Sequence, residues 1–336
     1  MRTRILQICL MMMVILPSCR SKEEMAYSTD PVDNVEALWD IIDTKYCYVE
    51  EKGVDWQAVH DEYIPKASVL PKNNPVALFD LCAAMLDTLQ DGHVNLYSAF
   101  DVSFNTAWYD SYPENFNTEL QKRYLRNYRI AGSLYYCLVD SGQVGYVYYP
   151  SFSSGFGESN IAWVLAGFRD CRGMIIDVRD NGGGEITNAY RLAAPFFTEN
   201  QTIGYWQHKT GPKHNAFSAM EPMELDASLI SSKWSKPVVV LCNRHSYSAT
   251  NLFISMMRYA KNATIVGGVS GGGGGMPMSY EMPNGWLVRF SSVRMYDREK
   301  KDIEPGIQPD IWVTMQSTDK DDIIEKAIEV IHAKTK

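Results

Sequence analysis

Apolar residues in the first part of the chain recur every three or four positions, which is the spacing of an amphipathic helix. Three segments with this pattern predict helices at residues 35–46, 56–63 and 75–89. The turn signal Asp91-Gly92 then leads into an alternating pattern at residues 94–97, which is typical of a short strand. We therefore predict a small helical domain at residues 34–97.

From residue 144 onward, short apolar runs alternate with helical periodicity. The runs predict strands at residues 145–149, 174–178, 202–207, 237–241 and 264–266. Helices are predicted at residues 160–168, at 185–197 and after Ser248, and a hairpin near 280–290, a strand at 311–314 and a helix at 319–332 complete the series. This alternation predicts an α/β domain with a mostly parallel sheet at residues 144–336. The aromatic-rich residues 98–143 are predicted to connect the two parts.

The N-terminus has the pattern of an export signal. Arg2 and Arg4 precede a short apolar run at residues 5–16, which is too short to span a bilayer comfortably. The following Leu-Pro-Ser-Cys resembles a bacterial lipobox, in which the cysteine is lipidated and becomes the mature N-terminus. We predict a lipoprotein signal peptide at residues 1–18, lipidation at Cys19 and a polar linker at residues 19–33. The protein would then be anchored in a bacterial cell envelope, facing the periplasm or the outer surface.

Composition and charge narrow the range of partners. The 336 residues are 46% hydrophobic, so the chain can bury a large core. The formal charge of −8 becomes −10 once Arg2 and Arg4 leave with the signal, which argues against a nucleic-acid partner. The five cysteines beyond Cys19 form no CxxC pair and no zinc spacing. We predict free thiols and no metal or other cofactor.

Ser248 lies on a predicted turn between a buried strand and a helix. The apolar run at residues 237–242 leads in, and the helical segment that begins after Ser248 leads out. The unpaired N–H groups of a helix's first turn stabilise negative charge, so a serine placed there can act as a nucleophile. Serine is also favoured there as a simple helix cap. This stretch alone favours the cap.

A second signal is a buried strand that runs directly into three glycines, Met174-Ile-Ile-Asp-Val-Arg-Asp-Asn-Gly-Gly-Gly184. Glycines in such a turn let backbone N–H groups face a ligand. The turn lacks the Lys-Ser/Thr of a P-loop and the spacing of a dinucleotide site. An oxyanion hole needs only two converging N–H groups, and Gly183 and Ala249 are the predicted pair.

Together these motifs resemble the tricorn and C-terminal processing protease family of serine peptidases. The resemblance rests on Ile-Ile-Asp-Val-Arg-x-Asn-Gly-Gly-Gly at 175–184, followed by Asn-x-x-x-Tyr-Ser-Ala at 243–249. Downstream, Ile-Val-Gly-Gly at 265–268, Pro-Asn-Gly at 283–285 and Pro-Gly-Ile-Gln-Pro-Asp at 305–310 follow in the family's order. The resemblance implies a crotonase/ClpP-like βα core and an acyl-enzyme formed on Ser248.

The general base separates the branches of this family. The processing branch uses a lysine in a glycine-rich segment, and Gly273 stands where that lysine would fall. The resemblance to the tricorn branch instead implies His93 as base, since a histidine follows the helical segment there. An unperturbed pKa of about 6.5 suits histidine to that task. Alternatives are that His93 is only a solvated loop residue, or that His245, three residues before Ser248, is the base.

Around the third catalytic member, the sequence departs from the tricorn branch twice. That branch has a serine immediately before the histidine, where this chain has Gly92, and a glutamate at the position of Ile303. The flanking acids are Asp302 and Glu304, of which Glu304 is the predicted partner. Asp177 and Arg179 are predicted to brace neighbouring loops rather than to touch a substrate.

The predicted activity is therefore that of an exported serine peptidase acting on a peptide or unfolded protein, anchored to a membrane by its lipid. Only about fifty residues separate His93 from residue 144, so we predict that the PDZ domain of the processing branch is absent. The departures around the base also leave open a non-catalytic protein that binds peptides or apolar ligands on the same fold. A hydrolase of non-peptide acyl groups would use the same residues.

Overall fold

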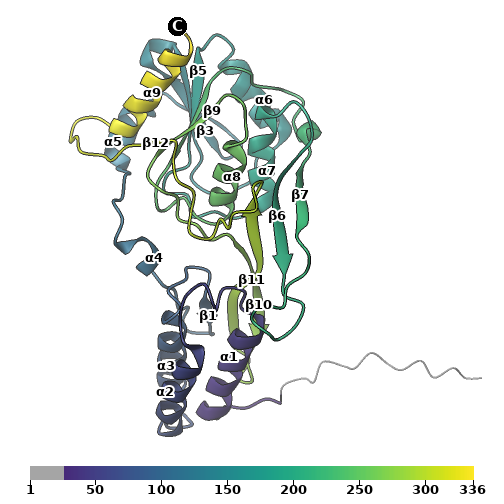
Figure 1. Cartoon of the computed structure of the whole chain (residues 1–336). Helices are drawn as coiled ribbons and strands as arrows, with labels where there is room; N and C mark the ends of the chain where they lie inside the picture. Colours follow the sequence, from purple (N-terminus) through teal and green to yellow (C-terminus); the bar gives the residue numbers. More distant parts are fainter. Residues whose placement is uncertain (1–25) are drawn as a thin grey trace, which may run out of the picture.

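A computed structural model describes residues 26–336 and divides them into a helical unit and a larger α/β core (Figure 1). The helical unit consists of α1 (Pro31–Lys45), α2 (Trp56–Ser68) and α3 (Pro75–Asp87). Each helix starts at a side chain that accepts a backbone N–H, namely Asp30, Asp55 and Asn74. Proline occupies the first turn of α1 and α3, where no N–H is needed.

An antiparallel sheet joins the helical unit to the core. Its strands run in the order β1-β11-β6-β7, with β10 also paired to β11. The strands are β1 (Asn95–Tyr97), β6 (Gln201–His208), β7 (Glu221–Leu225), β10 (Gly275–Glu281) and β11 (Leu287–Asp297). Met282, Val288 and Phe290 of the β10–β11 hairpin are buried in the same hydrophobic cluster as the three helices. Segments about two hundred residues apart therefore share one core.

The core domain is built on a second sheet of seven strands, in the order β12-β9-β8-β5-β4-β3-β2. The strands are β2 (Arg129–Ala131), β3 (Leu134–Val139), β4 (Val144–Tyr148), β5 (Gly173–Asp177), β8 (Val238–Cys242), β9 (Ala263–Gly267) and β12 (Ile311–Trp312). From β4 to β12 the pairs are parallel, whereas β2, β3 and β4 pair antiparallel. Every residue of β5 and β8 is buried, as expected for strands covered on both faces.

Helices cover both faces of this sheet. On one face lie α6 (Glu158–Gly167), α7 (Ile186–Ala193) and α8 (Ala249–Met257), packed against Ile176 and Val240. On the other lies α9 (Asp322–Lys334), packed against the alternate strand residues Ile175 and Val239. The short helices α4 (Ala107–Asp110) and α5 (Thr118–Tyr124) lie in the connecting region, and 3-10 turns occur at Asp140–Gly142, Ala194–Phe196 and Ala227–Leu229.

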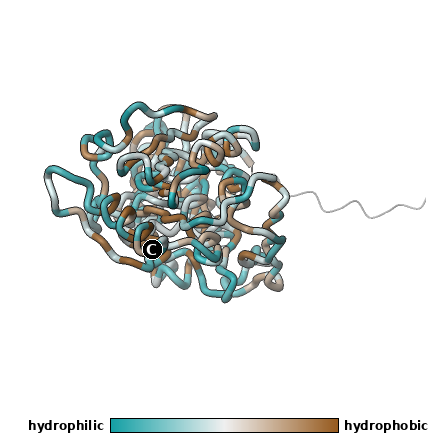
Figure 2. The backbone as a smooth tube through the Cα atoms, turned by 90° about the horizontal axis from the view of Figure 1, so that it is seen from above, coloured by the Kyte–Doolittle hydropathy of each residue, from teal (hydrophilic) through white to brown (hydrophobic). Residues whose placement is uncertain are grey.

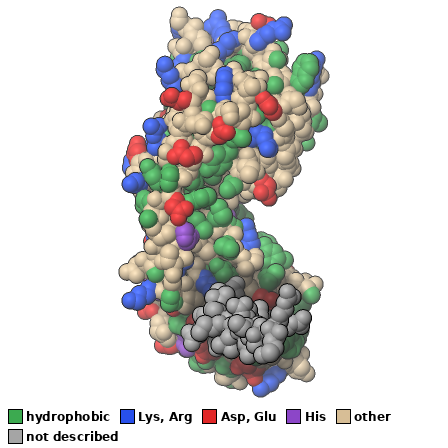
Figure 3. All heavy atoms as spheres, turned by 90° about the vertical axis from the view of Figure 1, so that its right-hand side faces the viewer, with side chains coloured by type: hydrophobic (Ala, Val, Ile, Leu, Met, Phe, Trp, Pro, Cys, Tyr) green, Lys and Arg blue, Asp and Glu red, His purple; other side chains and the backbone are tan. Residues whose placement is uncertain are grey.

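Hydrophobic stretches cross the middle of the molecule, and loops at its periphery are mostly hydrophilic (Figure 2). Viewed from the side, the core and the helical unit form an upper and a lower lobe, with a hollow between them at one edge (Figure 3). Among the helices of residues 26–336, none is both long and apolar enough to span a membrane.

The predicted α/β fold with an N-terminal helical region is confirmed, with two differences in the sheets. The strand predicted at residues 202–207 does not join the parallel sheet but forms β6 of the antiparallel one. Most of its side chains are only partly buried, which suits a sheet that is open on one side. In the predicted connecting region, β2 and β3 pair into the seven-stranded sheet. The predicted signal peptide and Cys19 lie outside the described residues.

Candidate active site

Ser248 lies between β8 and α8, on the turn that the sequence predicts. Its backbone has φ 58° and ψ −120°, a conformation that only a well-supported turn imposes on a residue with a side chain. The support includes the Ser248 N–H, which donates to the carbonyl of Gly272 at 2.9 Å. The hydroxyl makes no capping hydrogen bond to α8, so Ser248 does not act as the side-chain cap that its position alone would favour.

The imidazole of His93 faces this hydroxyl. Nε2 of His93 lies 3.0 Å from Oγ of Ser248, although 155 residues separate them in sequence. The ring is buried and packs against Tyr247, with their centroids 4.7 Å apart. Burial lowers the pKa of His93 to about 4, although the charge of Asp91 opposes the shift. The imidazole is therefore neutral near pH 7 and can accept a proton.

The other ring nitrogen of His93 faces a residue that the sequence analysis missed. Oγ of Ser291, on β11, lies 3.3 Å from Nδ1. Ser291 and Ser292 are both buried within a mainly apolar strand. Buried hydroxyls in such a strand need hydrogen-bond partners. Two serines within a mainly apolar strand are thus the one sequence signal that could have drawn attention to Ser291.

Glu304, the predicted third member, lies in a buried ionic cluster instead. Its Oε1 accepts a hydrogen bond from Nζ of Lys52 at 3.1 Å, and the same Nζ lies 3.6 Å from Asp91. Burial and then the charge of Asp91 raise the pKa of Glu304 to about 8. Within residues 26–336, neither Glu304 nor Asp302 hydrogen-bonds His93, and Asp302 accepts the backbone N–H of Glu304.

Asp91 is the carboxylate that holds the histidine loop in place. It accepts the backbone N–H of His93 at 2.8 Å and hydroxyl hydrogen bonds from Tyr46 and Tyr247. Burial alone would raise the pKa of Asp91, but Lys52 and His93 outweigh it and lower that pKa. Lys52 and Asp91 thus connect the helical unit to the segment that carries His93.

The predicted oxyanion pair lies directly beside Ser248. Gly183 has φ +98°, and a Cβ there would come within 2.8 Å of Cβ of Ser248, so the turn requires glycine. The Gly183 N–H donates to Oδ1 of Asn181 at 3.0 Å and is therefore already engaged. Ala249 is the first residue of α8, whose N–H has no acceptor within the helix.

His245, the alternative base, points elsewhere. Its Nδ1 lies 3.6 Å from Asp180, and its ring packs on Tyr109 with centroids 4.4 Å apart. It is also partly exposed to solvent. The structure thus brings His93 to Ser248 and leaves His245 with other partners.

The aromatic connecting region also reaches this site. Trp108, on α4, stacks on Tyr247 with ring centroids 4.2 Å apart. A Cβ at position 92 would lie 2.6 Å from Nε1 of Trp108, so the indole fills the space that the side chain of a serine at position 92 would need. The absence of a side chain at Gly92 therefore makes room for the indole of Trp108.

Comparisons with known proteins bear on the family and the fold of the chain. Residues 143–313 match peptidase family S41, and residues 33–87 match the tricorn protease C1 domain. A Parabacteroides merdae protein of known crystal structure is 45% identical, with a TM-score of 0.84 over 90% of this chain and 96% of that one. The structure of mature CPAF complexed with lactacystin is similar in fold, at 12% identity and a TM-score of 0.67 over 90% of this chain and 98% of that one.

Among curated proteins, the carboxy-terminal processing protease CtpB of Bacillus subtilis is 26% identical over 52% of this chain and 36% of its own length. A carboxy-terminal-processing protease of Bartonella bacilliformis is 27% identical over 44% of this chain and 32% of its own. The matched segment thus spans about a third of the length of these relatives. The match across residues 143–313 and the similarity over nearly the whole chain to the Parabacteroides protein show that this chain belongs to peptidase family S41, a family of serine peptidases.

Proposed function

We propose that the protein hydrolyses peptide bonds, with Ser248 as nucleophile and His93 as general base. The observation that carries this proposal is the 3.0 Å separation between Oγ of Ser248 and Nε2 of His93. Oγ attacks the carbonyl carbon of the substrate while Nε2 takes its proton. The same nitrogen then protonates the leaving amine, and an acyl-enzyme remains. Water activated by His93 hydrolyses this ester and releases Ser248.

The tautomer of His93 follows from this role. Nε2 must be unprotonated to accept the serine proton, so the ring hydrogen lies on Nδ1. At 3.3 Å, the hydroxyl of Ser291 can accept that hydrogen and keep the ring in the reactive orientation. We therefore assign Ser291 as the positioning residue of the base, in the place where Glu304 was predicted.

The oxyanion would form next to the two predicted N–H groups. The Ala249 N–H lies at the start of α8, where the helix dipole also favours negative charge. The Gly183 N–H would join it after exchanging its hydrogen bond to Asn181 for one to the oxyanion. The side chain of Asn181 would keep the hydroxyl of Thr250, which donates to Oδ1 at 2.8 Å.

A fluorophosphonate probe tests the nucleophile directly. Such probes phosphonylate an activated serine. The probe is therefore expected to label Ser248 of the wild type and to leave Ser248→Ala unlabelled. Mapping by peptide mass spectrometry identifies the modified residue. Equal labelling of both proteins would exclude Ser248. No labelling and no peptide turnover, together with tight binding of an apolar ligand, would favour a binding protein on the same fold.

Removing the hydroxyl of Ser291 is expected to slow catalysis moderately. A neutral hydrogen bond contributes about 1 kcal/mol net, so Ser291→Ala is expected to lower kcat/KM by about fivefold. The matched control is Ser292→Ala on the same strand, whose hydroxyl pairs with Tyr280 rather than with His93. Kinetics on a fluorogenic peptide measure both variants. An equal loss in the two would show that the effect comes from the strand and not from His93.

The pH profile is expected to reflect the lowered pKa of His93. The base works only when neutral, so activity should be lost as the pH falls through about 4 rather than through the usual histidine value of about 6.5. Between about pH 5 and 7, kcat/KM is expected to stay level. Circular dichroism at each pH separates protonation from unfolding. An acidic limb centred at 6 to 7 would contradict the buried, neutral imidazole.

We also propose that the protein is exported and anchored by a lipid on Cys19, and that it acts on peptides or unfolded proteins in the cell envelope. The lipobox-like Leu-Pro-Ser-Cys after a short apolar run supports the anchor. Wild type is expected to incorporate radiolabelled palmitate and to fractionate with membranes. Cys19→Ala is expected to do neither. Membrane association of Cys19→Ala equal to that of wild type would contradict the lipid anchor.

A further inference from the structure

The end of the helical unit farthest from the core gathers four chain segments. The start of α1, the loop between α2 and α3, the start of α3 and the β10–β11 turn all lie there (Figure 1). The N–H of Ser28 donates to the carbonyl of Pro283, and the N–H of Asn284 donates to Asn34, both at 3.1 Å. The described chain therefore begins at this end, fixed to the hairpin turn.

Large apolar side chains are exposed at this end. We call them the apolar end; they are Tyr27, Val69, Val76, Phe100 and Leu287. Tyr27 and Val69 are 77% and 79% exposed. Phe100 packs edge-on against Phe79 and Trp286, which sets it firmly in place with part of its ring in solvent. Exposed apolar side chains that gather on one part of a protein are a feature of interaction sites.

Two lysines close to the apolar end are paired with acids, so neither adds a free positive charge there. Lys72 forms an ion pair with Asp30 at 2.5 Å, and Lys66 pairs with Glu62 at 2.6 Å. A surface with exposed Tyr and Phe suits the interfacial zone of a bilayer, where aromatic rings lie at headgroup level.

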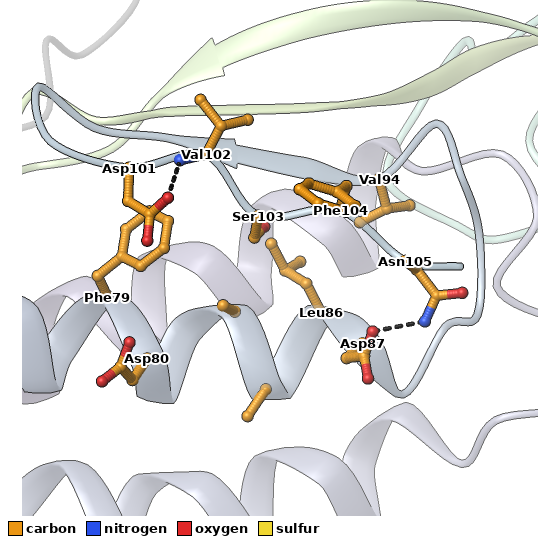
Figure 4. Close-up of a pocket in the computed structure, with 12 residues that line it drawn as sticks. Phe79, Asp80, Leu86, Asp87, Val94, Asp101, Val102, Ser103, Phe104 and Asn105 are labelled. Carbon is orange, nitrogen blue, oxygen red and sulfur yellow. Dashed lines mark hydrogen bonds between the residues drawn. The ribbon is translucent and has the colours of Figure 1, made fainter. Parts of the chain in front are cut away.

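The apolar end has a clear boundary along α3. Beside that helix, a hollow of about 470 Å³ is lined by Phe79, Val102 and Phe104, but Asp80, Asp87 and Asp101 stand around it (Figure 4). Inserting three carboxylates into a bilayer would cost far more than the apolar contacts contribute. Contact with lipid is therefore confined to the end of the unit.

The chain length before Ala26 connects this surface to a membrane. Seven peptide links separate Cys19 from Ala26, and they reach at most about 25 Å even when fully extended. We propose that the apolar end rests on the lipid bilayer that holds the lipid of Cys19, so that the protein is oriented by two contacts and not by one tether. This inference rests on the lipid anchor proposed above and is independent of the peptidase chemistry.

Docking in this way fixes the height of the catalytic residues. The 13 residues of α3 run from the apolar end towards His93, and at 1.5 Å per residue they span about 20 Å. Ser248 would be held roughly that far above the headgroups. Chain segments that emerge from the same membrane would then pass at the level of the site.

Fluorescent labels can test the orientation on the mature lipidated protein. The five native cysteines of residues 26–336 are buried, so a nitrobenzoxadiazole label would react at introduced cysteines. Val76→Cys and Phe100→Cys probe the apolar end, and Trp163→Cys and Trp312→Cys probe exposed positions on the core. In vesicles of phosphatidylethanolamine with a minor fraction of phosphatidylglycerol, labels at 76 and 100 are expected to shift to the blue and be quenched by headgroup nitroxides. Labels at 163 and 312 should report water.

The contribution to membrane residence can be measured by transfer between vesicles. Val76→Ser/Phe100→Ser is expected to leave the donor vesicles about tenfold faster than wild type, because less apolar area is removed from water. The matched control is Ile130→Ser/Leu138→Ser on the core, since those side chains are 58% and 51% exposed against 54% and 49% for Val76 and Phe100. The control should transfer at the wild-type rate.

The outcomes separate this proposal from the proposed peptidase activity. All three protein variants with serine or labelled cysteine at the apolar end are expected to hydrolyse a soluble peptide at the wild-type rate. Water-like signals at 76 and 100, or equal signals at all four labels, would overturn the docking while leaving the peptidase intact. A Val76→Ser/Phe100→Ser protein with normal membrane residence would overturn it as well.

Discussion

Replacing Ser248 with Ala, His93 with Ala, or both at once is expected to lower kcat by about the same factor, on the order of 10³ to 10⁶. In the proposed mechanism the two side chains act as one unit, since the serine is a weak nucleophile until Nε2 of His93, 3.0 Å away, removes its proton. Once either is lost, the other has nothing left to contribute. The activity that remains should come from the oxyanion N–H groups and from substrate binding.

Steady-state kinetics on one fluorogenic peptide compare the three variants. His245→Ala is the matched control, because His245 is close to Ser248 in sequence but pairs with Asp180 and Tyr109. It is expected to change kcat by less than about threefold. A double variant much slower than either single one would show that the two residues act independently. A full rate in His93→Ala would remove His93 from the mechanism.

The sequence predicted these two residues for different reasons. Ser248 stands out because an apolar run, a turn and a helical pattern follow one another within a few residues, and that local order is what places it at the start of α8. Nothing local places His93 beside it. That expectation came from a family resemblance, and the physical cause is the way the helical unit packs through Lys52 and Asp91 onto the core.

The partner of Nδ1 could not be read from the sequence, because it depends on strand register. Ser291 faces His93 only because of where β11 lies between β10 and β6. A shift of one residue would turn Ser292 inward instead. Glu304 was predicted as the third catalytic member from its spacing along the chain. In the structure its carboxyl group instead accepts a hydrogen bond from Lys52, 252 residues earlier.

The assignment of strands to sheets was also only partly predictable from the sequence. The fully buried runs that became β5 and β8 were predicted, since strands covered on both faces read as continuous apolar segments. The half-exposed β6 was predicted as a strand but assigned to the wrong sheet, and β7 was not predicted. The sheet that β6 joins depends on its pairing with β11, nearly one hundred residues away, which leaves little trace in local pattern; β7 in turn pairs with β6.

Arg179 was predicted to brace neighbouring loops, and its contacts lead us to expect that its loss would strongly destabilise the fold. Its side chain is fully buried; Nε and Nη2 donate to the two oxygens of Asp177 at 2.9 and 2.7 Å, and Nη1 donates to Asp321 at 3.0 Å. Asp321 is the N-cap of α9. One guanidinium thus fastens the end of β5 to the start of the last helix.

Arg179→Met is expected to lower the free energy of unfolding by about 3 to 5 kcal/mol, because it leaves two buried carboxylates without a counter-charge. Urea unfolding followed by tryptophan fluorescence measures the loss. Arg169→Met is the matched control, since Arg169 pairs with Asp170 at the surface, where both side chains are largely exposed; it should change stability by less than about 1 kcal/mol. Adding Asp177→Asn and Asp321→Asn to Arg179→Met is expected to restore part of the loss, because no buried charge then lacks a partner. If the triple variant were no more stable than Arg179→Met, lost packing and not uncompensated charge would be the cause.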